Sequence, residues 1–217
     1  AAMDWKKSMG VSLNEVYRQR AQQLRDQYDY LVLFFSGGAD STVILQSFVN
    51  YGIHLDEVVV AWPITQTEGR YTPNAQDFSP RNLLSEWQYA IKPKLDWLAQ
   101  HHPRVKITIC DVLDNPENNH FSEDTATFVD NHSYIGVNRN LQLDRILRDR
   151  TEQYPSCAGL FGVEPIECAI FDNQYLCAYF MDSATNGVMK SDYHPFTQYQ
   201  RNIEFFYWTP DMPEIVR

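Results

Sequence analysis

The sequence reads Phe35-Ser36-Gly37-Gly38-Ala39-Asp40-Ser41-Thr42 between an apolar run over 30–35 and a segment with helical spacing that starts at Val43. A strand that passes through two glycines into a helix makes a cradle for anions, because glycine lets backbone N–H groups approach an oxygen closely. The start of the helix adds unpaired N–H donors and a partial positive charge. This run therefore predicts a phosphate-binding loop in an α/β protein.

The polar side chains of the loop suit a nucleotide. Ser36, Ser41 and Thr42 bring hydroxyl donors to its rim. Asp40 brings a carboxylate that can face a metal ion or cap the helix. The two commoner nucleotide loops, GxxxxGK(S/T) and GxGxxG, are absent from the sequence. The alternative is an ordinary Gly-Gly turn that holds no ligand.

The order of these residues resembles the SGGxDS signature of the ATP pyrophosphatases, the PP-loop superfamily. In that superfamily the loop holds the pyrophosphate end of ATP while a nucleophile attacks the α-phosphate. The resemblance therefore implies an adenylating enzyme that forms AMP and pyrophosphate, with ATP and Mg²⁺ as its ligands. The residues implied to bind the nucleotide are Ser36, Gly37, Gly38, Asp40, Ser41 and Thr42. Asp40 and Ser41 are implied to be catalytic, and Asp40 is also implied to hold the metal.

Two later segments are similar to the phosphoadenosine-phosphosulfate-reductase-like branch of this superfamily, which bacteriophages often encode. They are the segment over 82–95, with its Pro93-Lys94-Leu95, and the aromatic tail over 206–213. A sulfonucleotide reductase is therefore a second candidate function, although no cysteine follows Cys177 to act as the catalytic cysteine of that branch. A non-catalytic nucleotide-binding or assembly protein is the third candidate, because we expect the aromatic tail to be exposed.

Hydrophobic patterning predicts the fold class. Continuous apolar runs over 30–35 and 57–62 are typical of strands that are covered on both faces in a parallel sheet, and a third strand is predicted over 105–110. Helical spacing predicts one helix before the first strand, over 12–28, and two helices between the strands, over 43–51 and 82–100. We expect a capping box at Ser12 and Glu15, and a kink or break at Pro93. The expected fold is α/β and Rossmann-like, with helices on both faces of the sheet, as the PP-loop resemblance also implies.

The C-terminal part has a different pattern. Two β-rich segments, 163–171 and 175–181, flank a turn at 172–174 and predict an antiparallel hairpin added to the parallel sheet. We expect a single domain over 12–217. Its nucleotide-binding core is expected over 12–150, and the hairpin with an aromatic C-terminal extension over 160–217. The chain ends without a polar taper, so we expect the natural protein to continue beyond residue 217.

Four further residues are candidates for the site, each with a structural alternative. Trp62 ends the second strand, where the resemblance places the adenine, although a core tryptophan is equally expected. Asp111 ends the third strand and is a candidate ligand of Mg²⁺ or of the ribose. Arg139 follows a turn, so it is expected to point at phosphates or to lie in solvent. Lys190 follows a polar loop over 182–187 and is a candidate catalytic residue that completes the phosphate site, with an ordinary turn as the alternative.

A long segment without periodicity, 63–80, follows the second predicted strand and is a candidate lid over the site. Arg70 and Arg81 lie in or beside it and are expected either to meet phosphate or to stay at the surface. A helix is predicted around 141–147. Its outer face carries arginines among acidic neighbours, which predicts a salt-bridged solvent face formed by Arg145, Arg148 and Arg150.

Composition restricts the partners. The chain has 217 residues, a hydrophobic fraction of 44% and a formal net charge of −10, which fit one globular α/β domain. Proteins that grip nucleic acid usually carry a basic face, so the expected partners are ATP and a small-molecule or protein acceptor, with a homodimer left open. The four cysteines form no C-x-x-C pair, as expected for free thiols in a reducing cytosol. No apolar run reaches the length of a membrane span, and we expect a cytoplasmic protein.

Overall fold

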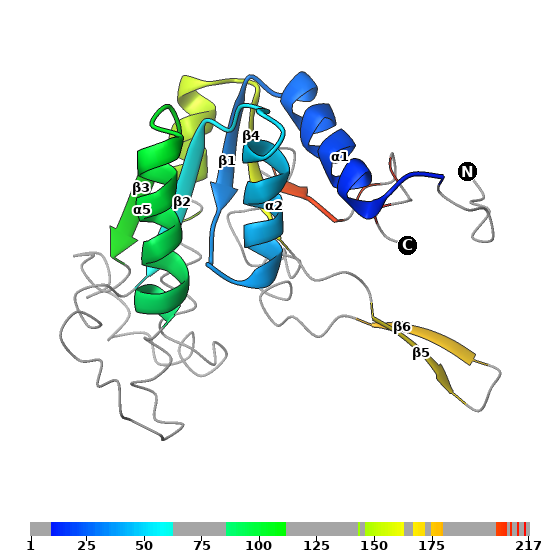
Figure 1. Cartoon of the computed structure of the whole chain (residues 1–217). Coiled ribbons are helices and arrows are strands. Elements are labelled where there is room, and N and C mark those ends of the chain that lie inside the picture. Colours follow the sequence, from blue (N-terminus) through cyan, green and yellow to red (C-terminus); the bar gives the residue numbers. More distant parts are fainter. Residues whose placement is uncertain are drawn as a thin grey trace, which may run out of the picture.

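A computed structural model describes residues 10–62, 86–111, 143, 146–162, 167–171, 175–179, 203–207, 209, 212 and 215, with only the backbone path at 167–171 and 175–179. Its main sheet has five parallel strands in the order β3-β2-β1-β4-β7 (Figure 1). The strands are β1 (Tyr30–Phe34), β2 (Glu57–Trp62), β3 (Lys106–Asp111), β4 (Cys157–Phe161) and β7 (Ile203–Phe205). This sheet confirms the expected α/β fold class.

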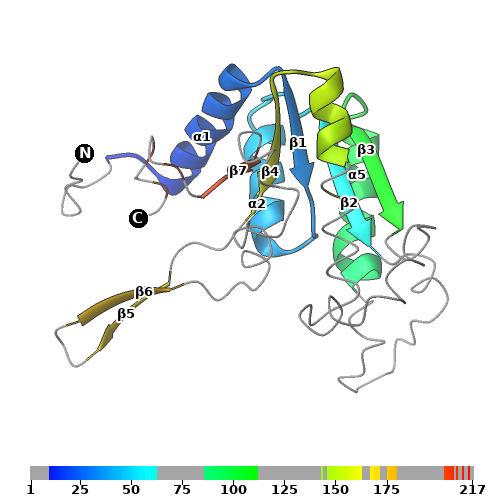
Figure 2. The same ribbon diagram turned by 180° about the vertical axis from the view of Figure 1, so that it is seen from behind.

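Helices cover both faces of the sheet. The front face in Figure 1 carries α2 (Ala39–Val49) and α5 (Lys92–His101), and α1 (Leu13–Gln27) packs beside α2. Figure 2, seen from behind, shows a helix over 146–153 on the opposite face. None of the helices in the described part of the chain combines the length and the apolar character that a membrane crossing requires.

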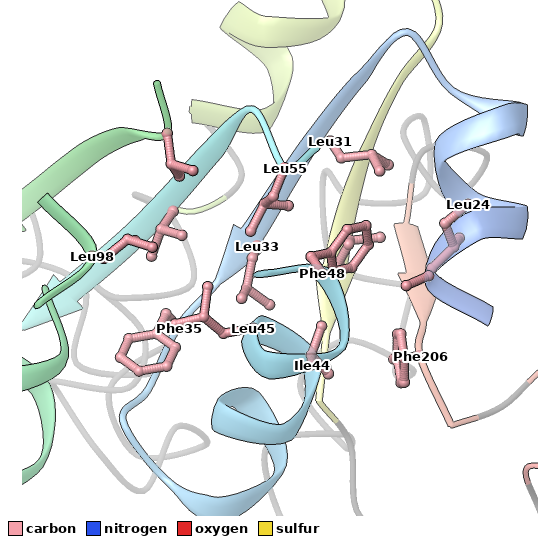
Figure 3. Close-up of a cluster of buried hydrophobic side chains, with 14 of the residues drawn as sticks. Leu24, Leu31, Leu33, Phe35, Ile44, Leu45, Phe48, Leu55, Leu98 and Phe206 are labelled. Carbon is pink, nitrogen blue, oxygen red and sulfur yellow. The ribbon is translucent and has the colours of Figure 1, made fainter. Parts of the chain in front are cut away.

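The core follows the alternation of side chains along the strands. Leu31 and Leu33 of β1 point to the face with α1, α2 and α5, where they are fully buried among the apolar residues of those helices (Figure 3). Val32 and Phe34 point to the other face, against Leu147 of the helix over 146–153. Because both faces are covered, a continuous apolar strand is the stable solution at the centre of the sheet.

Local sequence signals set the start of α1 and the shape of the segment before α5. The Ser12 hydroxyl accepts a hydrogen bond of 3.3 Å from the Glu15 backbone N–H, which confirms the cap predicted at this helix start. Pro93 lies in the first turn of α5, and a five-residue π-helical segment, η1 (Trp87–Ile91), comes directly before it. The expected interruption at Pro93 is therefore a widened turn, in which the Lys92 N–H bonds the Trp87 carbonyl five residues back.

The hairpin prediction is wrong in one respect. The strands β5 (Glu167–Phe171) and β6 (Tyr175–Tyr179) pair antiparallel with each other, but in a two-stranded sheet of their own. In the described part of the chain they do not extend the parallel sheet, whose strand beside β4 is β7. The main sheet thus contains β1, β2 and β3 from the expected core over 12–150, and also β7 from the expected extension over 160–217.

The aromatic tail is buried at Phe206 and Tyr207, contrary to the expectation of an exposed surface. Phe206 is fully buried and Tyr207 is 4% exposed. Arg20 of α1 is itself 1% exposed, and it donates to the Phe206 carbonyl and, at 2.9 Å, to the Glu204 carboxylate. Figure 3 shows Phe206 among the core side chains near Ile44. A buried cation on α1 therefore holds the C-terminal segment in the core.

Arg150 also departs from its prediction as part of a solvent face. Its guanidinium reaches the fully buried Glu57 carboxylate at the start of β2, with N–O distances of 2.6 and 3.0 Å. Burial alone would raise the pKa of Glu57, but hydrogen bonds from Arg150, Thr108 and Tyr30 outweigh it and lower the pKa to about 2. This ion pair ties the helix over 146–153 to the amino end of β2.

Candidate functional site

The glycine loop lies at the position where open α/β sheets bind ligands. The two neighbours of β1 are β2 on one side and β4 on the other, so the direction of chain winding reverses at β1. Ligands of such sheets bind in the crevice outside the carboxyl ends of the strands at this reversal. The loop over 35–38 connects the carboxyl end of β1 to α2 and therefore borders that crevice (Figure 1).

Gly37 is required in this loop for two independent reasons. Its φ is +80°, a left-handed conformation that residues with a side chain rarely adopt. A Cβ at this position would also lie 2.6 Å from Cγ1 of Ile91 and 3.3 Å from the Ile91 backbone nitrogen. The first glycine thus lets the loop turn and lets η1 pack directly against it.

Gly38 contributes in a different way, as the N-cap of α2. Its backbone is extended, with φ of −68° and ψ of 177°, and it has no side chain to cap the helix. Ser36, Gly38 and Ala39 are exposed. The start of a helix carries N–H groups without partners inside the helix and a partial positive charge, which suits an anionic ligand.

The loop hydroxyls form a network of their own. The oxygens of Ser36 and Ser41 lie 3.2 Å apart, and Ser41 is 3% exposed. Thr42 donates to the Gly38 carbonyl at 2.6 Å, so its proton is used inside the loop. This differs from the expectation that all three hydroxyls serve as donors at the rim. Ser36 is the exposed hydroxyl that a ligand can reach.

Asp40 lies in the first turn of α2, next to the C-terminal segment and the end of β4. Its backbone carbonyl accepts a hydrogen bond of 2.9 Å from the Tyr207 hydroxyl. Burial and then the Asp40 charge raise the pKa of both Tyr17 and Tyr207. A Cβ on Gly162, which follows β4, would lie 3.1 Å from the Asp40 Cβ. Three chain segments therefore define the surroundings of this carboxylate.

Lys94 is a site residue that the sequence prediction missed. Its ammonium donates to the Gly37 carbonyl at 2.7 Å and to the Thr42 hydroxyl at 2.9 Å. It comes from the first turn of α5, more than 50 residues along the chain from the loop. Sequence spacing carries no signal for such a contact. Lys94 was named only as part of the segment over 82–95 that resembles the reductase-like branch, and no role at the site was predicted for it.

Trp62 and Asp111 lie at the carboxyl edge of the sheet, Trp62 on β2 next to β1 and Asp111 on β3, one strand further from the loop. They pair with each other across β2 and β3. Since strands lie about 4.8 Å apart, β3 is roughly 10 Å from β1. Trp62 packs against the core, and its indole nitrogen is buried with no hydrogen-bond partner within the part of the chain that the structure describes.

A magnesium site at Asp40 and Asp111 stays a prediction. Among the described residues, no group of three or more His, Cys, Asp or Glu side chains gathers to hold a metal. Four candidate cations lie outside the described residues: Arg70, Arg81, Arg139 and Lys190.

The described thiols are not activated nucleophiles. Burial, together with the Glu57 charge, raises the pKa of Cys110. Burial and the charges of Glu57 and Asp56 raise the pKa of Cys157 to about 12. A thiol with a raised pKa is mostly protonated at neutral pH and reacts slowly. Cys168 and Cys177 lie on the paired strands β5 and β6, one register step apart.

Comparison with known proteins finds no family model and no curated protein sequence that matches the chain. The functional argument therefore depends on the loop and its geometry.

Proposed function

We propose that the chain is a PP-loop ATP pyrophosphatase, which binds ATP at the loop over 36–42 and activates an acceptor with release of pyrophosphate. One observation carries this proposal. The SGGADS run, which resembles the superfamily signature, lies at the crevice beside β1 and leads into a helix start that its N-cap residue does not cap. An ordinary Gly-Gly turn would need neither that position nor an exposed helix start.

The loop suits the terminal phosphates of ATP. Backbone N–H groups at the start of α2 and the exposed Ser36 hydroxyl are donors for phosphate oxygens. Gly37 keeps the loop tight against η1, so these donors are fixed before a ligand arrives. Donors that are already oriented lose little entropy on binding, which favours affinity.

The proposed reaction is attack of an acceptor oxygen on the α-phosphorus of ATP. The bond from that phosphorus to the bridging oxygen of the β-phosphate breaks, and pyrophosphate leaves with the electron pair. The helix start and Ser36 stabilise the negative charge that develops on the leaving group, a kind of contribution commonly worth a few kcal/mol. Mg²⁺ would neutralise phosphate charge, and Asp40 is the described carboxylate at the loop that can ligate it.

The described cysteines favour adenylation over reduction. A sulfonucleotide reductase needs a reactive thiol, whereas burial raises the pKa of both Cys110 and Cys157. The acceptor is a carbonyl or carboxylate oxygen of a small molecule or protein, and the net charge of −10 argues against nucleic acid.

The test combines binding with product analysis. Calorimetry ranks ATP, its α,β-methylene analogue and adenosine phosphosulfates, and ³¹P NMR follows ATP with Mg²⁺ in water, which serves as a slow acceptor. We expect ATP to bind and to yield AMP and pyrophosphate, and Asp40→Ala to abolish turnover. Tighter binding of a phosphosulfate would support a reductase, and ADP with phosphate as products would contradict the proposal. ATP that is bound but never cleaved would indicate a non-catalytic nucleotide-binding protein.

A further inference from the structure

We propose that Lys94 is a phosphate-binding residue of this site, whose ammonium bonds the terminal phosphates of the nucleotide. The inference rests on the proposed function and adds a residue that the loop sequence does not contain. It starts from the position of the ammonium, which already touches the loop at the Gly37 carbonyl and the Thr42 hydroxyl, at 2.7 and 2.9 Å.

The bonding of Lys94 leaves capacity for a ligand. An ammonium has three N–H donors, and the two contacts above use two of them. The ammonium also lies 5.9 Å from the centroid of the Phe35 ring, a contact that leaves its charge unneutralised. Within the described residues, no carboxylate pairs with Lys94. Lys92, two residues earlier, instead forms an ion pair of 2.6 Å with Asp96. The lysine at the loop therefore keeps its charge for another anion.

The neighbourhood of the loop needs such a charge. The first turn of α2 contains one charged residue, Asp40, and its carboxylate would repel a polyphosphate. In loops of the GxxxxGK(S/T) type, a lysine within the loop itself meets the phosphates. The loop here has no lysine, and Lys94 brings a cation to the same place from another helix.

The fold holds Lys94 at the loop through backbone packing as well. η1 approaches Gly37 so closely that a Cβ there would overlap Ile91, and Lys94 follows within one helical turn. Pro93 fixes the geometry of that turn. Single π-helical turns occur frequently at functional sites. Thr42 links the parts, because it donates to Gly38 and accepts from Lys94.

The test compares Lys94→Met, Lys94→Arg and the control Lys92→Met in calorimetric titrations with ATP and with AMP. AMP lacks the phosphates that the loop is proposed to hold. We expect Lys94→Met to weaken ATP binding by about 10- to 100-fold, with AMP affinity changed less than about threefold. Lys94→Arg should retain most of the ATP affinity, and Lys92→Met should match the wild type.

Each other outcome has a distinct meaning. ATP binding by Lys94→Met within twofold of the wild type overturns the role of Lys94 and leaves the proposed function standing. An equal loss for ATP and AMP also overturns it, because loss of a contact with the terminal phosphates would weaken the binding of ATP and not that of AMP. If the wild type binds no ATP, the proposed function fails and this inference fails with it. Thermal unfolding without ligand monitors folding, and Lys94→Gln, which keeps a hydrogen-bond donor, replaces the methionine variant if that variant does not fold.

Discussion

The Tyr207 hydroxyl donates a hydrogen bond of 2.9 Å to the backbone carbonyl of Asp40. The two residues are 167 positions apart, and the bond joins the C-terminal segment to the first turn of α2. Tyr207 also packs edge-on against Tyr17 of α1, with ring centroids 5.7 Å apart. The candidate catalytic aspartate is therefore positioned from outside its own helix.

Removing this hydroxyl tests the coupling. We expect Tyr207→Phe to lower the free energy of unfolding by about 1 kcal/mol, because one buried hydrogen bond is lost. ATP affinity should also fall, since the first turn of α2 becomes less fixed. Tyr28→Phe is the matched control, because its hydroxyl bonds Glu204 on β7, away from the loop. Urea denaturation and ATP titration measure both effects, and equal ATP affinities in the two variants would contradict the coupling.

Gly37 permits a separate test of the loop. Gly37→Ala should both strain a left-handed backbone and force a Cβ against Ile91. Gly52→Ala provides the control, because φ there is +65° and nothing lies within 4 Å of the added Cβ. We expect Gly52→Ala to cost about 1–2 kcal/mol from backbone strain alone and to bind ATP normally.

Gly37→Ala is expected to cost more than Gly52→Ala and to reduce ATP affinity at least about tenfold, because a shift of η1 moves both the loop donors and Lys94. Denaturation curves and calorimetric titration of the two variants give the comparison. If the two variants had similar unfolding free energies and similar ATP affinities, η1 would be able to move away from the added Cβ at little cost, and the close contact with Ile91 would not be needed.

The sequence predicted the parts of the fold that depend on local pattern. β1 and β2 were visible as continuous apolar runs, and the start of α1 followed from Ser12 and Glu15. β4 was not predicted, because it contains Gly159 and glycine has a low propensity for strands. The structure explains that glycine, since a Cβ there would lie 2.6 Å from the Phe34 ring on the neighbouring strand. A strand selected for fit to a neighbour has no signature of its own.

The same division holds at the site. The loop over 36–42 was predicted from its own residues, whereas Lys94 depends on how α5 packs against the loop. The role of Thr42 could not be predicted either. Its hydroxyl donates to the Gly38 carbonyl and accepts from Lys94, and the second bond depends on the tertiary packing. Contacts between distant segments are set by packing, and a single sequence does not encode them as spacing.

The hydrogen bonds of Arg20 to the C-terminal segment lead to a prediction about the stability of that segment. Arg20→Met keeps the apolar stem but removes the bonds to Glu204 and to the carbonyls of Phe205 and Phe206. We expect a loss of about 3 kcal/mol, as for removal of one partner of a buried charge pair. Hydrogen exchange should show faster exchange at 203–207. Arg18→Met, which removes a surface pair with Glu15, is the control and should leave that exchange unchanged.

The buried pair of Glu57 and Arg150 predicts how stability depends on pH. Its hydrogen bonds lower the pKa of Glu57 to about 2 despite burial, so folding favours the ionised carboxylate. The stabilisation is therefore complete at pH values above the unfolded pKa of about 4.5 and is lost as the pH falls toward 2. At pH 7 we expect Glu57→Gln to lower the free energy of unfolding by about 3 kcal/mol, since Arg150 loses its charged partner.

Glu15→Gln is the control for Glu57→Gln, because Glu15 has a similarly lowered pKa but is not buried. Hydrogen bonds from Arg18 and Gln19 also lower the pKa of Glu15 to about 2, but that carboxylate is at the surface, where water screens the pair. The free energy of unfolding of Glu15→Gln should therefore stay close to that of the wild type at every pH.

Urea denaturation between pH 2.5 and pH 7 gives the comparison. We expect the difference between wild type and Glu57→Gln to shrink steadily as the pH falls, because protonation removes the same charge that the substitution removes. A difference that stays constant with pH would mean that the shape of the carboxyl group, and not its charge, holds β2 to the helix over 146–153.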